Sequence, residues 1–172
     1  VYIPSSKHLH VVAAGPNIFF GNMGRPKPMS SINFEDESIE QYGAAKITDL
    51  SWKDALDYYA CTECGRCEEL CPAWNTEKPL SPKKLIVDLK SNLLAQKKQL
   101  LSRTSSKESD GQNSTEAGEI IDSNVTEDVI WSCTSCRAFE VACPVSIQHT
   151  DKIYETRRDL VMMKAKFPSE VQ

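Results

Sequence analysis

The stretch that decides the fold is Cys61-Thr-Glu-Cys64-Gly-Arg-Cys67-Glu-Glu-Leu-Cys71-Pro72. Its first three cysteines are separated by two residues each, and the fourth, which a proline follows, comes four positions after the third. This spacing is that of the cysteine ligands of a [4Fe–4S] cluster. The tight Cys-x-x-Cys turns aim three thiolates at one cluster. The fourth cysteine has by then entered a helix that points elsewhere, so in two-cluster proteins it binds the other cluster.

A second motif downstream repeats the spacing with one change. It reads Cys133-Thr-Ser-Cys136-Arg-Ala-Phe139-Glu-Val-Ala-Cys143-Pro144, and its phenylalanine stands where a third cysteine is expected. On the crossed assignment, the first cluster takes a full set of thiolates, from Cys61, Cys64, Cys67 and Cys143. The second site keeps only the thiolates of Cys71, Cys133 and Cys136.

The missing ligand leaves the content of the second site open. A phenyl ring cannot ligate iron, so Phe139 excludes an ordinary four-thiolate cluster there. A three-iron cluster, a four-iron cluster with one outside ligand, and no cluster at all are the alternatives. We expect His149 to be a surface residue, and it is also the candidate for an iron ligand that replaces the absent thiolate.

Composition limits the class of protein. The chain has 172 residues and a formal net charge of −4, which suits one compact domain with appendages. No basic stripe points to nucleic acid. The seven cysteines fall in two tight groups, each ending in Cys-Pro, which favours metal binding in a reducing compartment over a disulfide framework. No apolar run of about 20 residues predicts a membrane span, and no signal peptide is visible.

The pattern along the chain predicts a mainly α fold with an irregular N-terminal extension. We expect an apolar segment over 1–20, interrupted by Gly15 and Pro16, and an extended linker over 21–47. The helical domain should span 48–166 with a mobile loop at 102–118, and 167–172 should begin a following domain.

Helix signals flank both motifs. Ser51 with Asp54 forms a capping-box pattern before the helix that leads into Cys61, and Ser81-Pro82 begins a second helix with an apolar stripe. A last helix should follow the second motif and run to about Ala165, with Arg157 and Arg158 on its solvent side.

These helices and motifs resemble the helical two-cluster module, the alpha-helical ferredoxin, of succinate dehydrogenase, fumarate reductase and heterodisulfide reductase. The resemblance narrows at three segments, which are Ala-Cys-Thr-Glu-Cys-Gly-Arg-Cys, Trp-Ser-Cys-Thr-Ser-Cys-Arg-Ala and Arg-Arg-Asp-Leu-Val. They look like the heterodisulfide-reductase-related iron–sulfur-binding reductases of bacteria, of the electron-transfer-flavoprotein:menaquinone oxidoreductase type. The sequence departs from that family at Phe139.

The resemblance implies a membrane haem b domain before this segment and cysteine-rich domains after it. Ser6-Lys7-His8-Leu9-His10 resembles the cytoplasmic end of the last haem-domain helix, where His10 would be an axial haem ligand. The implied location is the cytoplasmic face of the bacterial inner membrane. The implied partners are a redox protein such as electron-transfer flavoprotein and a membrane quinone.

The predicted function is therefore an iron–sulfur electron-transfer module of a membrane-associated oxidoreductase. The segment shows no catalytic nucleophile, acid–base pair or nucleotide loop, so substrate chemistry is expected elsewhere in the parent. Two alternatives remain open. One is a structural zinc-binding module acting in protein interaction. The other is the iron–sulfur part of a succinate-dehydrogenase- or glycolate-oxidase-type complex.

Overall fold

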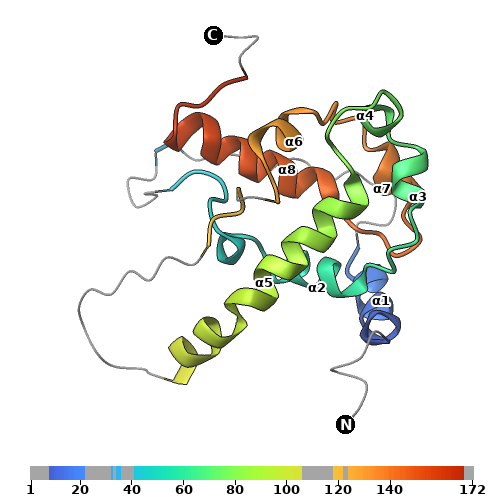
Figure 1. The fold of residues 1–172 in the computed structure, drawn as a ribbon. Helices are drawn as coiled ribbons and strands as arrows, with labels where there is room; N and C mark the ends of the chain where they lie inside the picture. The colour runs from blue at the N-terminus through green and yellow to red at the C-terminus, as the bar shows by residue number, and fades with distance from the viewer. Residues whose placement is uncertain are drawn as a thin grey trace.

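Helices make up most of the described part of the chain, and turns and extended segments join them (Figure 1). The structure, a computed structural model, describes residues 8–21, 32, 34–35, 41–105, 118–121 and 124–168, with only the backbone over 98–105. The α-helices are α1 (Leu9–Phe19), α2 (Trp52–Ala60), α3 (Arg66–Glu69), α4 (Pro72–Asn75), α5 (Pro82–Ser105), α6 (Glu127–Trp131), α7 (Ala138–Ala142) and α8 (His149–Arg158). A 3₁₀ turn spans Ile47–Asp49, and a π-helical segment, Asp159–Met163, continues α8. The described residues contain no strand, only an isolated bridge between Lys46 and Glu119, so the predicted mainly α class is confirmed.

The predicted capping box begins α2. The Ser51 side chain accepts a hydrogen bond from the Asp54 backbone N–H, and the Asp54 carboxylate accepts one from the Ser51 backbone N–H at 3.0 Å. This reciprocal pair satisfies two of the N–H groups that every helix leaves unpaired at its start. The helix then ends at Ala60, so that Cys61 is the first residue after it.

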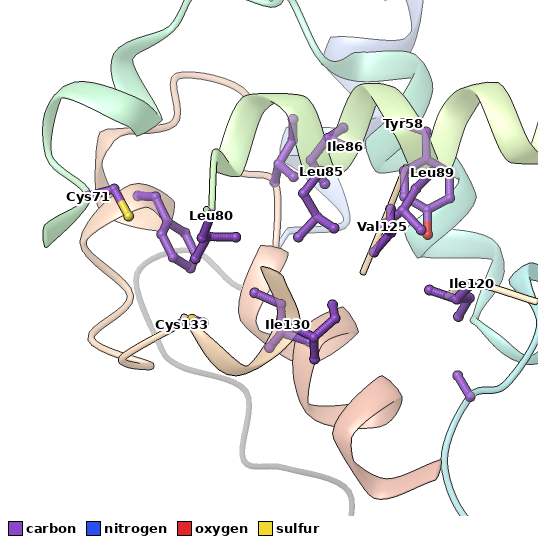
Figure 2. Packing of buried hydrophobic residues seen from close by; sticks show 14 of the residues in the cluster. Tyr58, Cys71, Leu80, Leu85, Ile86, Leu89, Ile120, Val125, Ile130 and Cys133 are labelled. Carbon is purple, nitrogen blue, oxygen red and sulfur yellow. The ribbon is translucent and has the colours of Figure 1, made fainter. Parts of the chain in front are cut away.

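The predicted apolar stripe of α5 faces the main core. Ile86 and Leu89 are buried there, and Figure 2 shows them with Leu85 opposite Ile120 and Ile130. Cys71 and Cys133 lie at one end of the same core, near Leu80. Each buried Leu or Ile contributes about 1.5–3 kcal/mol by leaving water, so this stripe contributes substantially to the stability of the fold.

The described part of the N-terminal apolar segment forms the helix α1, which continues through Gly15 and Pro16. Proline removes one helical hydrogen bond, but α1 continues to Phe19 and ends with the Phe20 N–H donating to the Pro16 carbonyl. Packing against α2 supports the helix through this weak point. The buried Asn17 also donates from Nδ2 to the Val145 carbonyl at 2.8 Å, which ties α1 to the loop after the second motif.

The other boundaries differ from expectation by a few residues. Residues 102–105 of the predicted loop continue α5, and most of the remaining loop lies outside the described residues. The last helix begins at His149 and its π-helical continuation ends at Met163, two residues before Ala165. Of the expected linker, only 21, 32, 34–35 and 41–47 are described, and 167–168 are the only described residues of the expected following domain.

Gly43 should be the glycine least tolerant of a side chain. It has φ +88°, and a Cβ there would lie 2.4 Å from the Glu155 carbonyl oxygen and 2.5 Å from the Asp159 nitrogen. We expect Gly43→Ala to cost about 3 kcal/mol or more in unfolding free energy, since left-handed strain of about 1–2 kcal/mol adds to overpacking of about 1–3 kcal/mol.

Gly65→Ala is the matched control in urea unfolding followed by circular dichroism. Gly65 also has a left-handed φ, +82°, but the nearest atom to its Cβ would be the Glu68 Oε2 at 3.6 Å. Only the strain of about 1–2 kcal/mol should appear. Equal losses in the two variants would contradict the clash at Gly43.

Candidate metal centre

The first cysteine motif forms a loop between α2 and α3. Cys61 follows the last residue of α2, and two residues of the loop, Glu63 and Gly65, have left-handed φ values of 55° and 82°. These two reversals let the chain turn twice within a few residues. α3 then begins at Arg66, so that Cys67 lies in its first turn.

Four of the predicted ligands line one pocket, although they come from distant parts of the sequence. The thiols of Cys61 and Cys67 interact electrostatically with that of Cys143 from the second motif. Packing of α3 against α7 brings the two motifs together, and Figure 1 shows both helices at one end of the molecule. The pocket has an empty volume of about 310 Å³, open solvent included, and its cysteines are Cys61, Cys64, Cys67 and Cys143.

Burial sets the protonation of these thiols in the metal-free chain. It raises the pKa of Cys61 and Cys143, and that of Cys67 to about 12, where the neighbouring thiols add to the effect. At the exposed Cys64, burial also acts to raise the pKa, but hydrogen bonds from the Arg66 backbone and the Thr62 side chain lower it overall. Because metal ligation needs thiolates, loading this pocket must release protons.

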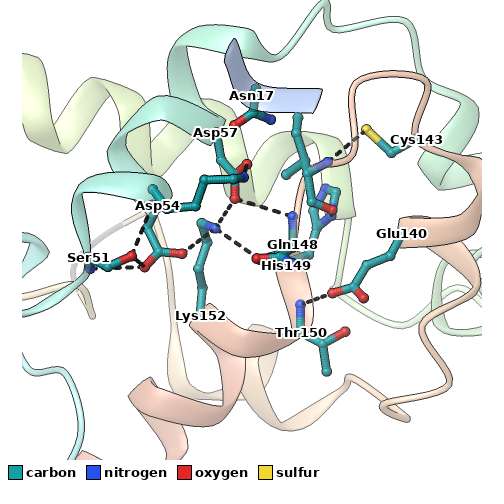
Figure 3. Close-up of polar contacts among 12 residues, drawn as sticks. Asn17, Ser51, Asp54, Asp57, Glu140, Cys143, Gln148, His149, Thr150 and Lys152 are labelled. Carbon is teal, nitrogen blue, oxygen red and sulfur yellow. Dashed lines mark hydrogen bonds and ion pairs between the residues drawn. The ribbon is translucent and has the colours of Figure 1, made fainter. Parts of the chain in front are cut away.

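A backbone hydrogen bond positions Cys143. Its Sγ accepts from the Ile147 N–H at 3.4 Å, and the next N–H, that of Gln148, donates to Asp57 Oδ2 at 3.2 Å. Figure 3 shows this sequence of contacts from α2 to the cysteine. Asp57 therefore holds the loop that supplies a hydrogen bond to the sulfur, and such bonds tune iron–sulfur potentials.

Asp57 belongs to a buried ionic network that the sequence did not reveal. Lys152 of α8 is 2% exposed, and its Nζ lies 2.6 Å from Asp57 Oδ2 and 2.7 Å from Asp54 Oδ1 (Figure 3). Lys53 adds a contact of 2.7 Å to Asp57 Oδ1. Burial would raise the pKa of both carboxyls, but Lys152 outweighs it and holds them below their ordinary value. The same carboxylates outweigh the burial of Lys152 and raise its pKa.

The second motif has the same backbone shape as the first. Its first two cysteines lie between α6 and α7. Its left-handed residues, Ser135 and Arg137 with φ 59° and 60°, stand at the positions equivalent to Glu63 and Gly65. Neither is a glycine, so the left-handed backbone costs about 1–2 kcal/mol of folding free energy at each of these residues.

Arg157 supports the second loop from α8. Its guanidinium donates to the carbonyls of Ile130 and Cys133, each at 2.7 Å, and to Ser135 Oγ at 3.3 Å. The expectation that Arg157 points to solvent is wrong, because these carbonyls turn toward α8 and draw the side chain in. Helical periodicity alone could not show this.

The ligands expected at the second site lie in two different environments. Cys71 and Cys133 are buried in the apolar core together with Phe139, which is 1% exposed, whereas Cys136 is exposed. Burial raises the pKa of Cys133, although a hydrogen bond from the Ser135 N–H to its Sγ, at 3.3 Å, opposes the effect.

His149 is buried, so the surface position expected for it is wrong. It is 2% exposed, its Nδ1 lies 3.2 Å from the Ile147 carbonyl oxygen, and its ring packs on Phe139 with centroids 4.9 Å apart. Burial lowers its pKa to about 3. The ring also lines the pocket of the first site. His10, the candidate haem ligand, lies in α1 and is half-buried.

The residues of the first pocket fit a [4Fe–4S] cluster. Four thiols, the full ligand number of such a cluster, surround one space that both motifs enclose. By contrast, no group of three or more His, Cys, Asp or Glu within the described ranges is placed to hold a single metal ion. No helix among the described residues has both the length and the apolar character needed to cross a membrane.

Comparison with known proteins gives one family and several relatives. The profile of the 4Fe-4S dicluster domain matches residues 60–147. FadF of Bacillus subtilis, a probable iron-sulfur-binding oxidoreductase, is 40% identical over 100% of this chain and 28% of its own length. The EtfAB:quinone oxidoreductase of Syntrophomonas wolfei is 37% identical over 99% of this chain and 25% of its own length.

A third relative is a probable membrane-anchored ferredoxin of Chromohalobacter salexigens. It is 31% identical over 87% of this chain and 23% of its own length. The chain thus spans about a quarter of the length of these relatives. No solved structure matches it significantly.

Proposed function

The chain belongs to the family of 4Fe-4S dicluster domains, and on that premise we propose that one [4Fe–4S] cluster is held by the thiols of Cys61, Cys64, Cys67 and Cys143. The observation that carries this proposal is the pocket that these four residues line together. The family and the named relatives confirm the predicted iron–sulfur electron-transfer module of an oxidoreductase, so the zinc alternative is not retained.

When bound, a [4Fe–4S] cluster supplies one-electron transfer. The protein's part is to hold the ligands and set their surroundings. The Ile147 N–H donates to Cys143 Sγ, and Arg66 lines the pocket, whereas Lys83 is paired with Glu68 Oε2 at 2.8 Å. A hydrogen bond to sulfur favours the reduced state, so the Ile147 N–H should raise the reduction potential.

The exposed edge of the pocket is the place where a redox partner can approach. Cys64 is exposed there, as are Thr62, Glu63 and Arg66 of the same loop. We assign electron-transfer flavoprotein as the partner class and a membrane quinone as the second redox partner, since one relative is named an EtfAB:quinone oxidoreductase.

The proposal places the domain at the cytoplasmic face of the bacterial inner membrane, in keeping with a relative named as membrane-anchored. In this proposal, the electron-transfer domain spans 48–166, and a membrane haem domain ends with 1–20. The linker between them is 21–47, and a further domain begins at 167–172. His10 would then be an axial ligand of haem b. A haem-free absorption spectrum of the full-length membrane protein would exclude that role.

The test of the proposed function is the metal content and electron paramagnetic resonance of the anaerobically purified chain. We expect iron and acid-labile sulfide in equal amounts, at least about four of each per chain, and a reduced four-iron signal after dithionite. Anaerobic reconstitution controls for loss of the cluster to air. Zinc without sulfide after reconstitution would contradict the proposal.

A further inference from the structure

We propose that this chain is a one-cluster member of its two-cluster family, in which the Phe139 ring fills the second site and Cys71, Cys133 and Cys136 hold no cluster. The inference rests on the proposed function, because the single remaining cluster is the one assigned to the first pocket. It goes further by excluding those three cysteines from cluster ligation.

Packing is the first observation. Phe139 is 1% exposed and belongs to the same apolar cluster as Cys71, which is 1% exposed, and Cys133, which is 6% exposed. Leu80 and Ile130 complete this end of the core (Figure 2). Protein interiors are close-packed, so a second cluster could enter only if the Phe139 ring left the core.

The number of ligands is the second observation. A phenyl ring offers iron no ligand atom, so at most three protein thiolates remain for a cluster that uses four. His149 packs against Phe139, lines the first pocket and has its Nδ1 3.2 Å from the Ile147 carbonyl oxygen. Because its ring lines the pocket of the first site, we assign His149 to that site and not to the second site as a replacement for the missing thiolate.

The backbone of the second loop is intact, so we attribute the absence of the second cluster to Phe139 alone. Ser135 and Arg137 keep the left-handed pair seen at Glu63 and Gly65, and Arg157 still holds the carbonyls of the loop. The backbone around the second site therefore retains the shape that ligation needs, and only the third cysteine is absent. One substitution, Phe139→Cys, should restore the second cluster.

The consequence for function is a relay with a single redox centre. Donor and acceptor must then both exchange electrons with the cluster in the first pocket. Its exposed loop at Cys64 becomes the common point of approach within this domain.

The experiment compares the iron content and the electron paramagnetic resonance spectra of the wild type and four variants after anaerobic reconstitution. The wild type should hold about four irons per chain, and Phe139→Cys about eight, a twofold gain with a second reduced four-iron signal. Phe139→Leu is the control for loss of the aromatic ring, and it should stay at about four irons. Cys64→Ser and Cys136→Ser form a matched pair, because both cysteines are exposed and occupy equivalent positions in their motifs.

The matched pair keeps the test valid even if Phe139→Cys folds poorly. We expect Cys64→Ser to lose the cluster and Cys136→Ser to keep the wild-type iron content. About seven or eight irons in the wild type with a three-iron signal on oxidation, or a loss of iron in Cys136→Ser, would overturn the inference and leave the proposed function standing. A folded Phe139→Cys chain without added iron would also overturn it. Absence of iron from the wild type would instead contradict the proposed function.

Discussion

Cys143→Ser is expected to abolish the cluster of the first motif, whereas Cys71→Ser should leave it intact. Cys71 is the nearer of the two in sequence, and it ends the same motif. However, Cys143 lines the pocket with Cys61 and Cys67, while Cys71 lies in the apolar core. Iron should fall from about four per chain to near zero in Cys143→Ser only, and the reduced resonance signal should vanish with it.

Far-UV circular dichroism separates loss of ligation from loss of fold. Serine is smaller than cysteine and keeps a hydrogen-bonding atom near the Ile147 N–H, so the helical spectrum of Cys143→Ser should match that of the wild type. Cluster loss in Cys71→Ser with retention in Cys143→Ser would mean that the four cysteines of one motif bind one cluster. That result would refute the crossed arrangement.

Lys152→Met should be among the most destabilising single substitutions in this chain. It removes the cation between two carboxylates and leaves Asp57, which has a fully buried side chain, with Lys53 as its remaining cationic partner. Breaking a buried ion pair in this way costs about 3–5 kcal/mol, because the remaining charge stays desolvated. Lys53→Met is the matched control. The Lys53 side chain is 13% exposed, and its loss should cost less than that of Lys152, because Asp57 then keeps its contact with the buried Lys152.

The same network predicts a pH dependence with a definite sign. The pKa values of Asp54 and Asp57 are lowered in the folded chain, so their contribution is present above the unfolded value near 4 and is lost as pH falls toward the folded values. The raised pKa of Lys152 gives stability that is fully present below about 10.4, its unfolded value, and is lost only in more alkaline solution.

Urea unfolding at several pH values checks both statements. The wild type should lose stability below about pH 4, and the difference between wild type and Lys152→Met should shrink there, since the acids then bind protons. Comparing the two chains at each pH cancels the acid lability of the cluster that they share. A difference that is constant from pH 7 to about pH 3 would contradict the role assigned to Lys152.

The sequence by itself determined the chemistry and the local structure. Cysteine spacing is a local property, because a Cys-x-x-Cys turn has few possible shapes, so the [4Fe–4S] assignment could be made from the motif. Helix starts are also local. The Ser51–Asp54 capping box and the start of α5 at Pro82 depend on hydrogen bonds and backbone angles within a few residues, and both were predicted.

Only the tertiary structure decided what surrounds each polar or functional group. Lys152 and His149 have the sequence signature of surface residues, yet Asp54 and Asp57 of α2 enclose the first and Phe139 of α7 covers the second. Arg157 turns inward because the carbonyls of another segment face it. Periodicity tells which residues share a helix face, but the burial of that face depends on an element distant in sequence. For the same physical reason, the motif shows that Phe139 cannot bind iron, and only the packing shows that its ring is buried in the core that contains Cys71 and Cys133.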